Sequence, residues 1–210
     1  MDDQAYITAA SDGPSSLKEA QKSEEWPKWQ QAIRAKLDQL HAMSTWTLVD
    51  SSCDIVPITN KWVFQKKLNK EGQIVKYKAR LVTRGCAQHL GYDYLETHSP
   101  VVQLKTIRAI LVMVPTKKLV VQQMDVKGAY LNGILKERVY MHQSEGFKDG
   151  TGKICLLVKT LYGLRQSGHE WNIQFDVRVR KHGFLLLCSD THPLGHMAQC
   201  RCLHRCGMLV

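Results

Sequence analysis

The chain has 210 residues, of which 44 % are apolar, and its 29 Lys and Arg against 19 Asp and Glu give a formal net charge of +10. This length allows one domain or one and a half with a real core, and the positive charge favours a polyanionic partner such as nucleic acid. No stretch reaches the ~18 apolar residues of a membrane span, and the acidic start lacks the pattern of a signal peptide. We therefore expect an intracellular protein, cytoplasmic or nuclear, that is neither secreted nor bound to a membrane and keeps its seven cysteines as free thiols.

The first 44 residues divide into a polar lead and a helical segment. Residues 1–15 are predicted to be a flexible lead. Residues 16–44 are predicted to be helical, because Ser16 followed by Glu19 fits a capping box and Pro27 marks a break or restart. Apolar residues then recur at steps of three and four, at Trp26, Trp29, Ile33, Leu37 and Leu40. The two tryptophans could stack on bases, but the helical spacing favours packing in a core.

A strongly basic hairpin is predicted next. Lys61–Leu68 and Gln73–Val82 have the pattern of strands joined by the turn Asn69–Gly72, after a shorter strand at Thr45–Val49. Residues 61–84 carry eight Lys and Arg against one acidic residue. Interleaved aromatic side chains suit contact with a nucleic-acid backbone and a nucleoside triphosphate. A solvated charged edge that blocks strand-to-strand aggregation fits the composition equally well.

The following helix carries an apolar stripe. Ser99 and Pro100 form a helix start, as N-cap and first-turn proline, and Pro115 is predicted to end the helix. The stripe predicts a helix that packs under a sheet in a structural role. Its residues are Val101, Leu104, Ile107, Ile110, Leu111 and Val114. Asp93 and Glu96, just before it, are interpreted as part of a solvated loop rather than as an acid/base pair.

A buried strand that delivers a carboxylate is predicted at Leu119–Val126. Asp125 stands at its end, and Mg²⁺ is usually bound through one or two carboxylates together with substrate phosphates. The same residue could instead be a solvated Asp that closes a turn. The following Gly128–Gly133 fits either a short helix or a hairpin turn, and further strands are predicted at Glu137–Met141 and Lys153–Val158.

The last part of the chain combines a helix with a tail rich in Cys and His. Gln166–His182 predicts an amphipathic helix with its buried side at Trp171, Phe175 and Val179. Residues 191–210 contain no carboxylate, and two interpretations of this tail compete. One is a zinc site, although the spacing matches none of the usual Cys-x-x-Cys forms, and the other is a frame-shifted or mis-spliced end. The possible zinc ligands are His192, His196, Cys200, Cys202 and Cys206.

Several blocks of the sequence carry a resemblance to one family: Lys61-Trp62-Val63-Phe64, Tyr77-Lys78-Ala79-Arg80-Leu81-Val82, Val120–Leu131 and Thr160–Asn172. They are similar to motifs of the Ty1/copia-type retrotransposon reverse transcriptases, the RNA-directed DNA polymerase region of the Pol polyprotein. The resemblance covers residues 45–190. It implies an α/β fold of the α+β type, with a fingers hairpin and an incomplete palm in which helices pack on an antiparallel sheet. The implied partners are an RNA template, a DNA primer and a dNTP, with integrase and RNase H on other segments of the polyprotein.

The resemblance also implies a set of site residues. Asp125 would hold catalytic Mg²⁺ or Mn²⁺, with the Val126 carbonyl as a further ligand, and Tyr130 would lie under the incoming sugar. The implied nucleotide-binding residues are Gln166, Arg80 and one of Lys66, Lys67 or Lys78. The implied nucleic-acid contacts are Lys61, Arg84, Arg165 and Gly168. Which of the three lysines faces the nucleotide stays open, since successive strand residues point to opposite faces.

The sequence departs from the family pattern in several places. His98, Ser144 and His169 replace the usual Phe, Pro and Arg, and no Asp-Asp pair follows Asp125. Two-metal phosphoryl transfer needs carboxylates from more than one strand, so we expect half a metal site, doubtful metal binding and no activity of the chain alone. The alternative interpretation is a non-catalytic nucleic-acid-binding remnant.

Overall fold

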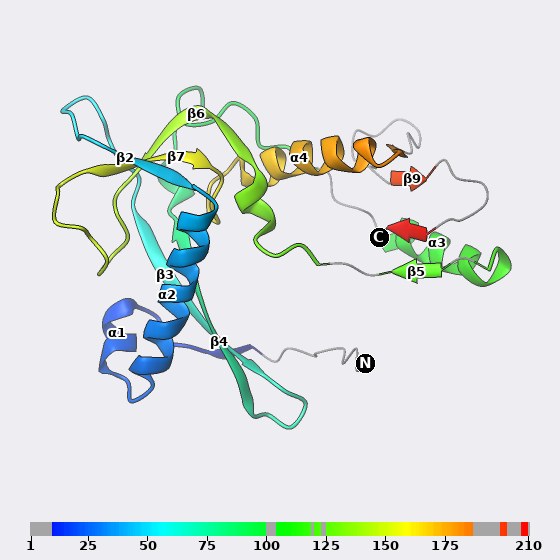
Figure 1. Cartoon of the computed structure of the whole chain (residues 1–210), viewed down its shortest axis with the longest axis horizontal. Helices are drawn as coiled ribbons and strands as arrows, with labels where there is room; N and C mark the ends of the chain where they lie inside the picture. Colours follow the sequence, from blue (N-terminus) through cyan, green and yellow to red (C-terminus); the bar gives the residue numbers. More distant parts are fainter. Residues whose placement is uncertain are drawn as a thin grey trace. The chain divides into compact units, whose positions relative to one another are not determined.

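The residues described by the computed structural model are 10–99, 104–118, 120–122, 125–186, 198–200 and 207–209. The chain divides into two compact units, the first of Met1–Leu95 with Leu135–Arg165 and the second of Glu96–Ile134 with Gln166–Val210. The described part contains four α-helices, antiparallel sheets and the short parallel pair of β5 with β10 (Figure 1). The predicted mixed α/β class is therefore confirmed.

A long antiparallel hairpin dominates the first unit. β3 (Asn60–Leu68) and β4 (Ile74–Thr83) pair along their length. Gly72 closes the turn at a φ of +78°, and its N–H donates to the Asn69 carbonyl at 3.1 Å. Both strands begin and end within one residue of the predicted positions.

A third strand joins the hairpin at the side of β3. β1 (Ala10–Asp12) pairs antiparallel with β3, which makes β3 the central strand and β4 an edge strand of this sheet. Residues 1–15 were predicted to be a flexible lead, and the strand at Ala10–Asp12 differs from that prediction. A run of three residues is too short for an alternating pattern to be visible in the sequence.

Two helices accompany the hairpin. α1 (Leu17–Lys22) begins after Ser16, whose hydroxyl accepts a hydrogen bond from the N–H of Glu19 at 3.3 Å. α2 (Trp26–Ala42) starts anew with Pro27 in its first turn, as predicted, and runs along the hairpin (Figure 1). The side chains of α2 that are fully buried, at 0 % exposure, are Trp29, Ile33 and Leu40. Core packing of this stripe is confirmed at these three positions.

A second sheet in the same unit has the strand order β2-β7-β6. Its strands are β2 (Trp46–Val49), β6 (Ile134–Met141) and β7 (Ile154–Lys159), and β2 runs antiparallel to β7. All three were predicted, although β6 begins three residues before the predicted start at Glu137. A short 3-10 helix, η1 (Gly85–Ala87), follows β4.

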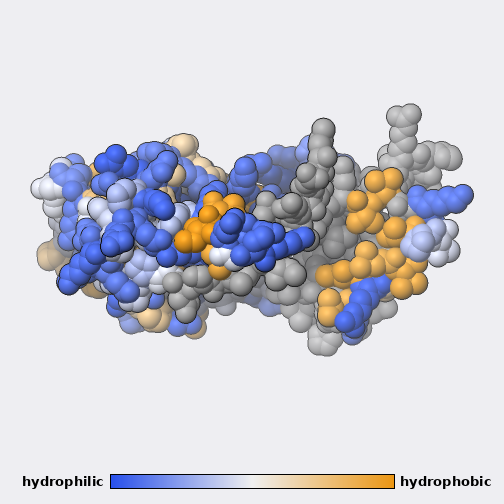
Figure 2. All heavy atoms as spheres, turned by 90° about the horizontal axis from the view of Figure 1, so that it is seen from below, coloured by the Kyte–Doolittle hydropathy of each residue, from blue (hydrophilic) through white to orange (hydrophobic). Residues whose placement is uncertain are grey.

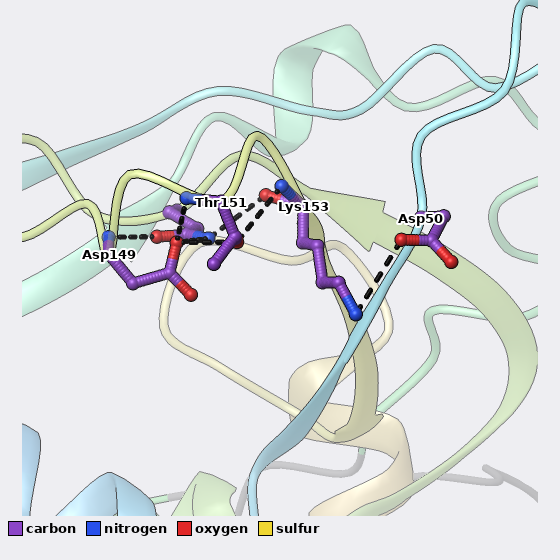
Figure 3. Close-up of polar contacts among 5 residues, drawn as sticks. Asp50, Asp149, Thr151 and Lys153 are labelled. Atoms are coloured by element: carbon purple, nitrogen blue, oxygen red, sulfur yellow. Dashed lines mark hydrogen bonds and ion pairs between the residues drawn. The ribbon is translucent and has the colours of Figure 1, made fainter.

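A network of hydrogen bonds orders the loop between β6 and β7 (Figure 3). Asp149 Oδ1 accepts from the Thr151 hydroxyl at 2.7 Å and from the Gln143 amide at 2.8 Å. These bonds, that of Thr151 first, hold the pKa of Asp149 below its ordinary value. Lys153 Nζ lies 3.6 Å from Asp50 Oδ1, just beyond β2, so the loop is also tied to the neighbouring strand.

The second unit contains α3 (Leu104–Thr116), the 3-10 helix η2 (Ala129–Asn132) and α4 (Ser167–Lys181), with α4 against η2. Its strands are β5 (Val120–Gln122), β8 (Phe184–Leu186), β9 (Ala198–Cys200) and β10 (Gly207–Leu209). β8 pairs antiparallel with β9, and β5 pairs parallel with β10. Gly128–Gly133 was predicted to be either a short helix or a hairpin turn, and η2 shows that it is a short helix.

The apolar stripe of α3 is only partly covered, since Ile107 and Val114 are half-buried and two of its leucines are exposed. Leu104 and Leu111 are 60 % and 50 % exposed, and Figure 2 shows apolar atoms gathered over this helix at the right of the view. The predicted packing under a sheet is therefore not seen among the described residues. Pro115 lies inside the last turn instead of ending the helix before it. No helix in the described ranges is both long and apolar enough to span a bilayer.

The buried side of α4 differs from its prediction. Trp171, Phe175 and Val179 are only half-buried, although the first two rings touch at a centroid distance of 5.6 Å. The fully buried side chains lie at the start of the helix and just before it, and they are Gln166, Ser167 and Glu170. All three are polar and take part in interactions, so an apolar pattern could not reveal their burial.

Candidate nucleotide and nucleic-acid interface

The register of the hairpin sorts its side chains onto two faces. Side chains alternate along a strand, and residues directly opposite one another share a face. Trp62 and Phe64 point toward the buried face, where they lie opposite Leu81 and Ala79. The other face carries the pairs Lys61–Val82, Val63–Arg80, Gln65–Lys78 and Lys67–Lys76.

Four of the predicted cations therefore share one face of the hairpin. They are Arg80, Lys78, Lys67 and Lys61. Arg80 and one of the three lysines Lys66, Lys67 or Lys78 were predicted to bind the nucleotide, and Lys61 was predicted to bind nucleic acid. Arg80 is held in place, because its Nη1 donates to the Gln65 Oε1 at 2.9 Å. A row of cations on one side of a twisted ribbon is suited to a chain of phosphates.

Lys66 belongs to the opposite face. It lies opposite Tyr77, and its Nζ is 2.6 Å from the Glu25 Oε2. The Tyr77 hydroxyl donates to the other oxygen of Glu25 at 2.7 Å. The hydrogen bond from Lys66 and then that from Tyr77 hold the pKa of Glu25 below its ordinary value. Lys66 thus ties the hairpin to the start of α2, and of the three lysines only Lys67 and Lys78 share the face of Arg80.

The base of the hairpin meets the segment before α4 at a pair of glycines. Thr83 N–H donates to the Tyr162 carbonyl at 2.8 Å. Gly163 has a φ of +97°, and a Cβ atom there would collide with the Thr83 carbonyl oxygen. A Cβ atom on Gly85 would in turn collide with the Gly163 carbonyl oxygen. The chain can turn here only because both positions lack side chains.

Arg165 is anchored at the same junction. Its Nε donates to the Gly85 carbonyl at 3.0 Å, and its backbone N–H donates to the Gln88 Oε1 at 2.9 Å. Its guanidinium lies 5.6 Å from the centre of the Tyr94 ring, a cation–π distance. Arg84, the other predicted nucleic-acid contact in this region, is exposed. Both arginines are thus presented at the base of the hairpin.

The predicted metal ligand lies in the second unit. Asp125 is exposed, and the neighbouring Val126 is 43 % exposed. Gly128 adopts a left-handed conformation at a φ of 67°, and η2 then buries Leu131 and leaves Tyr130 half-buried. Asp125 precedes the turn that leads into η2, and Tyr130 lies within η2. The strand before Asp125 was predicted to be buried, but β5 is short and exposed, with Val120 at 67 % and Val121 at 40 % exposure.

The start of α4 packs against the segment that precedes α3. Gly168 accepts a hydrogen bond from the Ser99 hydroxyl at 3.1 Å, and a Cβ atom on Gly168 would lie 3.2 Å from the Ser99 Cβ. His169 Nδ1 lies 2.6 Å from the His98 carbonyl oxygen, so the two His departures from the family pattern meet here. Gln166 is only 1 % exposed. Ser99 is therefore a close neighbour of Gly168, a contact that the sequence did not suggest.

The described residues do not assemble a complete metal site. Asp125 offers one carboxylate, and in the described ranges no group of three or more His, Cys, Asp or Glu could hold a metal ion. A pair of Mg²⁺ ions needs more oxygen ligands than one carboxylate supplies. Four of the possible zinc ligands lie outside the described residues, and only the backbone of Cys200 is described.

These observations define a protein class. A basic antiparallel hairpin and a mixed α/β arrangement are accompanied by a match to the family model of the reverse transcriptase (RNA-dependent DNA polymerase) over residues 43–195. The chain belongs to the reverse transcriptase family. Reverse transcriptases act with divalent metal ions on a nucleic-acid template and primer.

The relatives identify the branch as the Ty1/copia type. The chain is 38 % identical over 188 residues to the retrovirus-related Pol polyprotein from transposon TNT 1-94 of Nicotiana tabacum, covering 88 % of the chain and 14 % of that protein. It is 32 % identical over 157 residues to the Ty1-ER2 Gag-Pol polyprotein of Saccharomyces cerevisiae, covering 69 % of the chain and 8 % of that protein. An uncharacterized mitochondrial protein of Arabidopsis thaliana, AtMg00820, is 41 % identical over 133 residues, with 63 % of the chain and 71 % of that protein covered. No solved structure matches the chain significantly.

Proposed function

We propose that the chain provides the fingers and part of the palm of a retrotransposon reverse transcriptase, and that it does not copy a template by itself. The observation that carries this proposal is the common face of Arg80, Lys78 and Lys67 on the hairpin. On this face three cations stand at successive ladder positions, as contacts to the phosphates of a nucleotide or template would require.

The remaining roles follow from the family. Asp125 supplies a carboxylate for the catalytic metal, and Tyr130 contacts the incoming sugar. Arg84 and Arg165 contact nucleic-acid phosphates, which is supported by their presentation at one junction. Gln166 is proposed to lie beneath the bound nucleotide and to support the nucleotide-binding site. Its burial supports a role in positioning the backbone that the nucleotide touches.

The inactivity of the chain alone rests on its carboxylates. Two-metal catalysis places metals ~3.5–4 Å apart between carboxylates from more than one strand. No Asp-Asp pair follows Asp125, and no Asp or Glu follows Asp190. In other family members, we propose, the remaining carboxylates lie in the segment that follows the position of Asp190. In this chain residues 191–210 occupy that position and contain no carboxylate.

Binding of a labelled RNA–DNA hybrid by the whole chain tests the proposal. Binding should weaken steeply with salt, and Lys67→Gln or Arg80→Gln should each lower the slope of log K against log salt by about 1. Asp125→Asn should leave binding intact. The matched control is Lys18→Gln, which removes one charge from an exposed position on α1. Equal losses of binding in Lys67→Gln, Arg80→Gln and Lys18→Gln would show non-specific charge attraction and would contradict the assigned face.

A second candidate function is a nucleic-acid-binding remnant with no catalytic capacity left. It is favoured by the loss of acidic residues after Asp190 and by the departures His98 and His169. A chimera separates the two candidates: residues 191–210 are replaced by the Asp-Asp segment of a family member. If the chimera synthesises DNA and Asp125→Asn abolishes this activity, the Asp125 half of the metal site is intact. If the chimera folds well but is inactive, the chain is a non-catalytic nucleic-acid-binding remnant.

A further inference from the structure

A loop in the first unit presents an exposed aromatic side chain beside two arginines. We propose that Tyr92, in the loop of residues 89–95, is a stacking platform for an unpaired base of single-stranded nucleic acid, and that Arg84 and Arg165 hold the adjacent phosphates. The inference rests on the proposed function. It adds a site for unpaired bases to the phosphate contacts proposed above.

The loop is closed by its own hydrogen bonds. Gly91 N–H donates to the Tyr94 carbonyl at 2.9 Å. Asp93 N–H donates to the His89 carbonyl at 2.9 Å, and His89 N–H donates in return to the Asp93 Oδ2 at 2.8 Å. Asp93 is the only acidic residue of the sequence between positions 84 and 95, and its carboxylate is thus engaged by the backbone of the loop. The loop holds its side chains in a defined arrangement.

Three large side chains of this loop face solvent. Tyr92 is 87 % exposed, and Leu90 and Leu95 are 67 % and 69 % exposed. Large side chains that gather on an ordered surface loop form a surface that a partner can cover. The bases of a duplex are already stacked on their neighbours, so only an unpaired base can offer its face to the ring of Tyr92.

Principles of chain geometry and direct contacts bring the arginines to this loop. The Arg165 guanidinium lies 5.6 Å from the centre of the Tyr94 ring, and Tyr94 is separated from Tyr92 by at most about 7 Å between Cα atoms. Arg165 Nε donates to the Gly85 carbonyl at 3.0 Å, which places Arg165 beside the neighbour of the exposed Arg84. Among the residues that the structure describes, neither arginine forms an ion pair. A strand whose base stacks on Tyr92 therefore brings its phosphates to two cations.

Charge decides between nucleic acid and another protein as the partner of this loop. The exposed leucines would suit either partner. The two arginines and the net charge of +10 favour a polyanion, and an aromatic ring stacks on a base of any identity. A single strand of RNA or DNA, bound without preference for its sequence, therefore fits the loop best.

The test compares two labelled RNA–DNA hybrids on the whole chain, one blunt and one with a single-stranded overhang of about six nucleotides. The parent should bind the overhang form more tightly than the blunt form. Tyr92→Ala should weaken binding of the overhang form by roughly fivefold or more and leave binding of the blunt form unchanged. Tyr92→Phe keeps the ring and should bind like the parent, whereas Tyr92→Leu should bind like Tyr92→Ala. Val56→Ala is the control, at another loop position that is 89 % exposed.

A 5-iodouridine in the overhang gives a second measurement, because light couples this base to an aromatic ring that stacks on it. Mass spectrometry should locate the crosslink at Tyr92. Unchanged binding of the overhang form by Tyr92→Ala, or a crosslink at another site, would overturn the inference and leave the loop as a surface for another protein. Binding of the blunt form by the parent would keep the proposed function standing in that case. If the parent binds neither form, the proposed function fails and the inference fails with it.

Discussion

Gly163 lies directly against the carbonyl oxygen of Thr83, so that the segment before α4 and the end of the basic hairpin share a backbone contact. The contact is reinforced by the hydrogen bond from Thr83 N–H to the Tyr162 carbonyl at 2.8 Å. It joins the cationic face of the hairpin to the anchor of Arg165. Because the backbones are in direct contact, the cations of the hairpin and Arg165, which are all predicted to contact phosphate, have little freedom to move apart.

Substitution of Gly163 by alanine should therefore be severe. The new Cβ would meet the Thr83 carbonyl oxygen, and the φ of +97° is unfavourable for any L side chain. We expect a loss of about 2–4 kcal/mol in the free energy of unfolding, measured by urea denaturation. Gly150→Ala is the control, because Gly150 has a φ of +78° with no atoms nearby and should lose only about 1 kcal/mol. Equal losses of unfolding free energy in Gly163→Ala and Gly150→Ala would contradict a close backbone contact at Gly163.

Trp29 is predicted to be the main anchor between α2 and the hairpin. It is 0 % exposed and lies edge-on to Phe64 and Tyr77, at centroid distances of 5.2 and 4.7 Å. Trp29→Ala should lower the free energy of unfolding by about 3–5 kcal/mol. Trp29→Phe should cost less, because it also removes a buried indole N–H without a partner. Val56→Ala, at a position 89 % exposed, should change stability by less than about 0.5 kcal/mol.

The hairpin shows what the sequence could and could not predict. Strand alternation and the turn residues around Gly72 predicted both strands, since these signals are local. The face of each lysine could not be predicted, because the phase of a strand depends on what packs against it. Here Trp29 of α2 selects the face of Phe64 and so places Lys66 on that face as well.

The candidate site was predictable to a different extent in each unit. Asp125 and Tyr130 come from a motif, and Tyr130 lies in η2, a short distance along the chain from Asp125. The junction of Gly85 with Gly163 was missed, because a close approach between segments far apart in the chain leaves only a turn signal in each. The pair of Glu25 with Lys66 was missed for the same reason.

Acid should weaken the link between Glu25 and the hairpin. The folded-state pKa of Glu25 is depressed, so its stabilising contribution is present above the unfolded pKa and is lost as the pH falls through the folded pKa. Glu25→Gln should cost about 1 kcal/mol near pH 7, and this difference from the parent should disappear as the pH falls through the folded-state pKa of Glu25. Glu24→Gln is the control at the adjacent exposed residue. A difference that stays constant over the pH range would exclude the ion pair as its source.

The cysteines of the first unit should differ in reactivity. Burial, and then the charge of Asp149, raises the pKa of the Cys155 thiol to about 11, whereas Cys53 and Cys86 are exposed. Because the thiolate is the nucleophile, iodoacetamide at about pH 8 should modify Cys53 and Cys86 and spare Cys155 until urea unfolds the chain. Peptide mapping by mass spectrometry resolves the three sites. Rapid labelling of native Cys155 would show that β7 opens far more readily than its burial implies.

Primer extension on poly(rA)/oligo(dT) with Mg²⁺ tests the central claim most directly. We expect the purified chain to bind the primer–template in a salt-sensitive manner and yet to extend no primer, because Asp125 alone cannot hold the two metal ions. Robust synthesis by the parent chain that is lost in Asp125→Asn would contradict it.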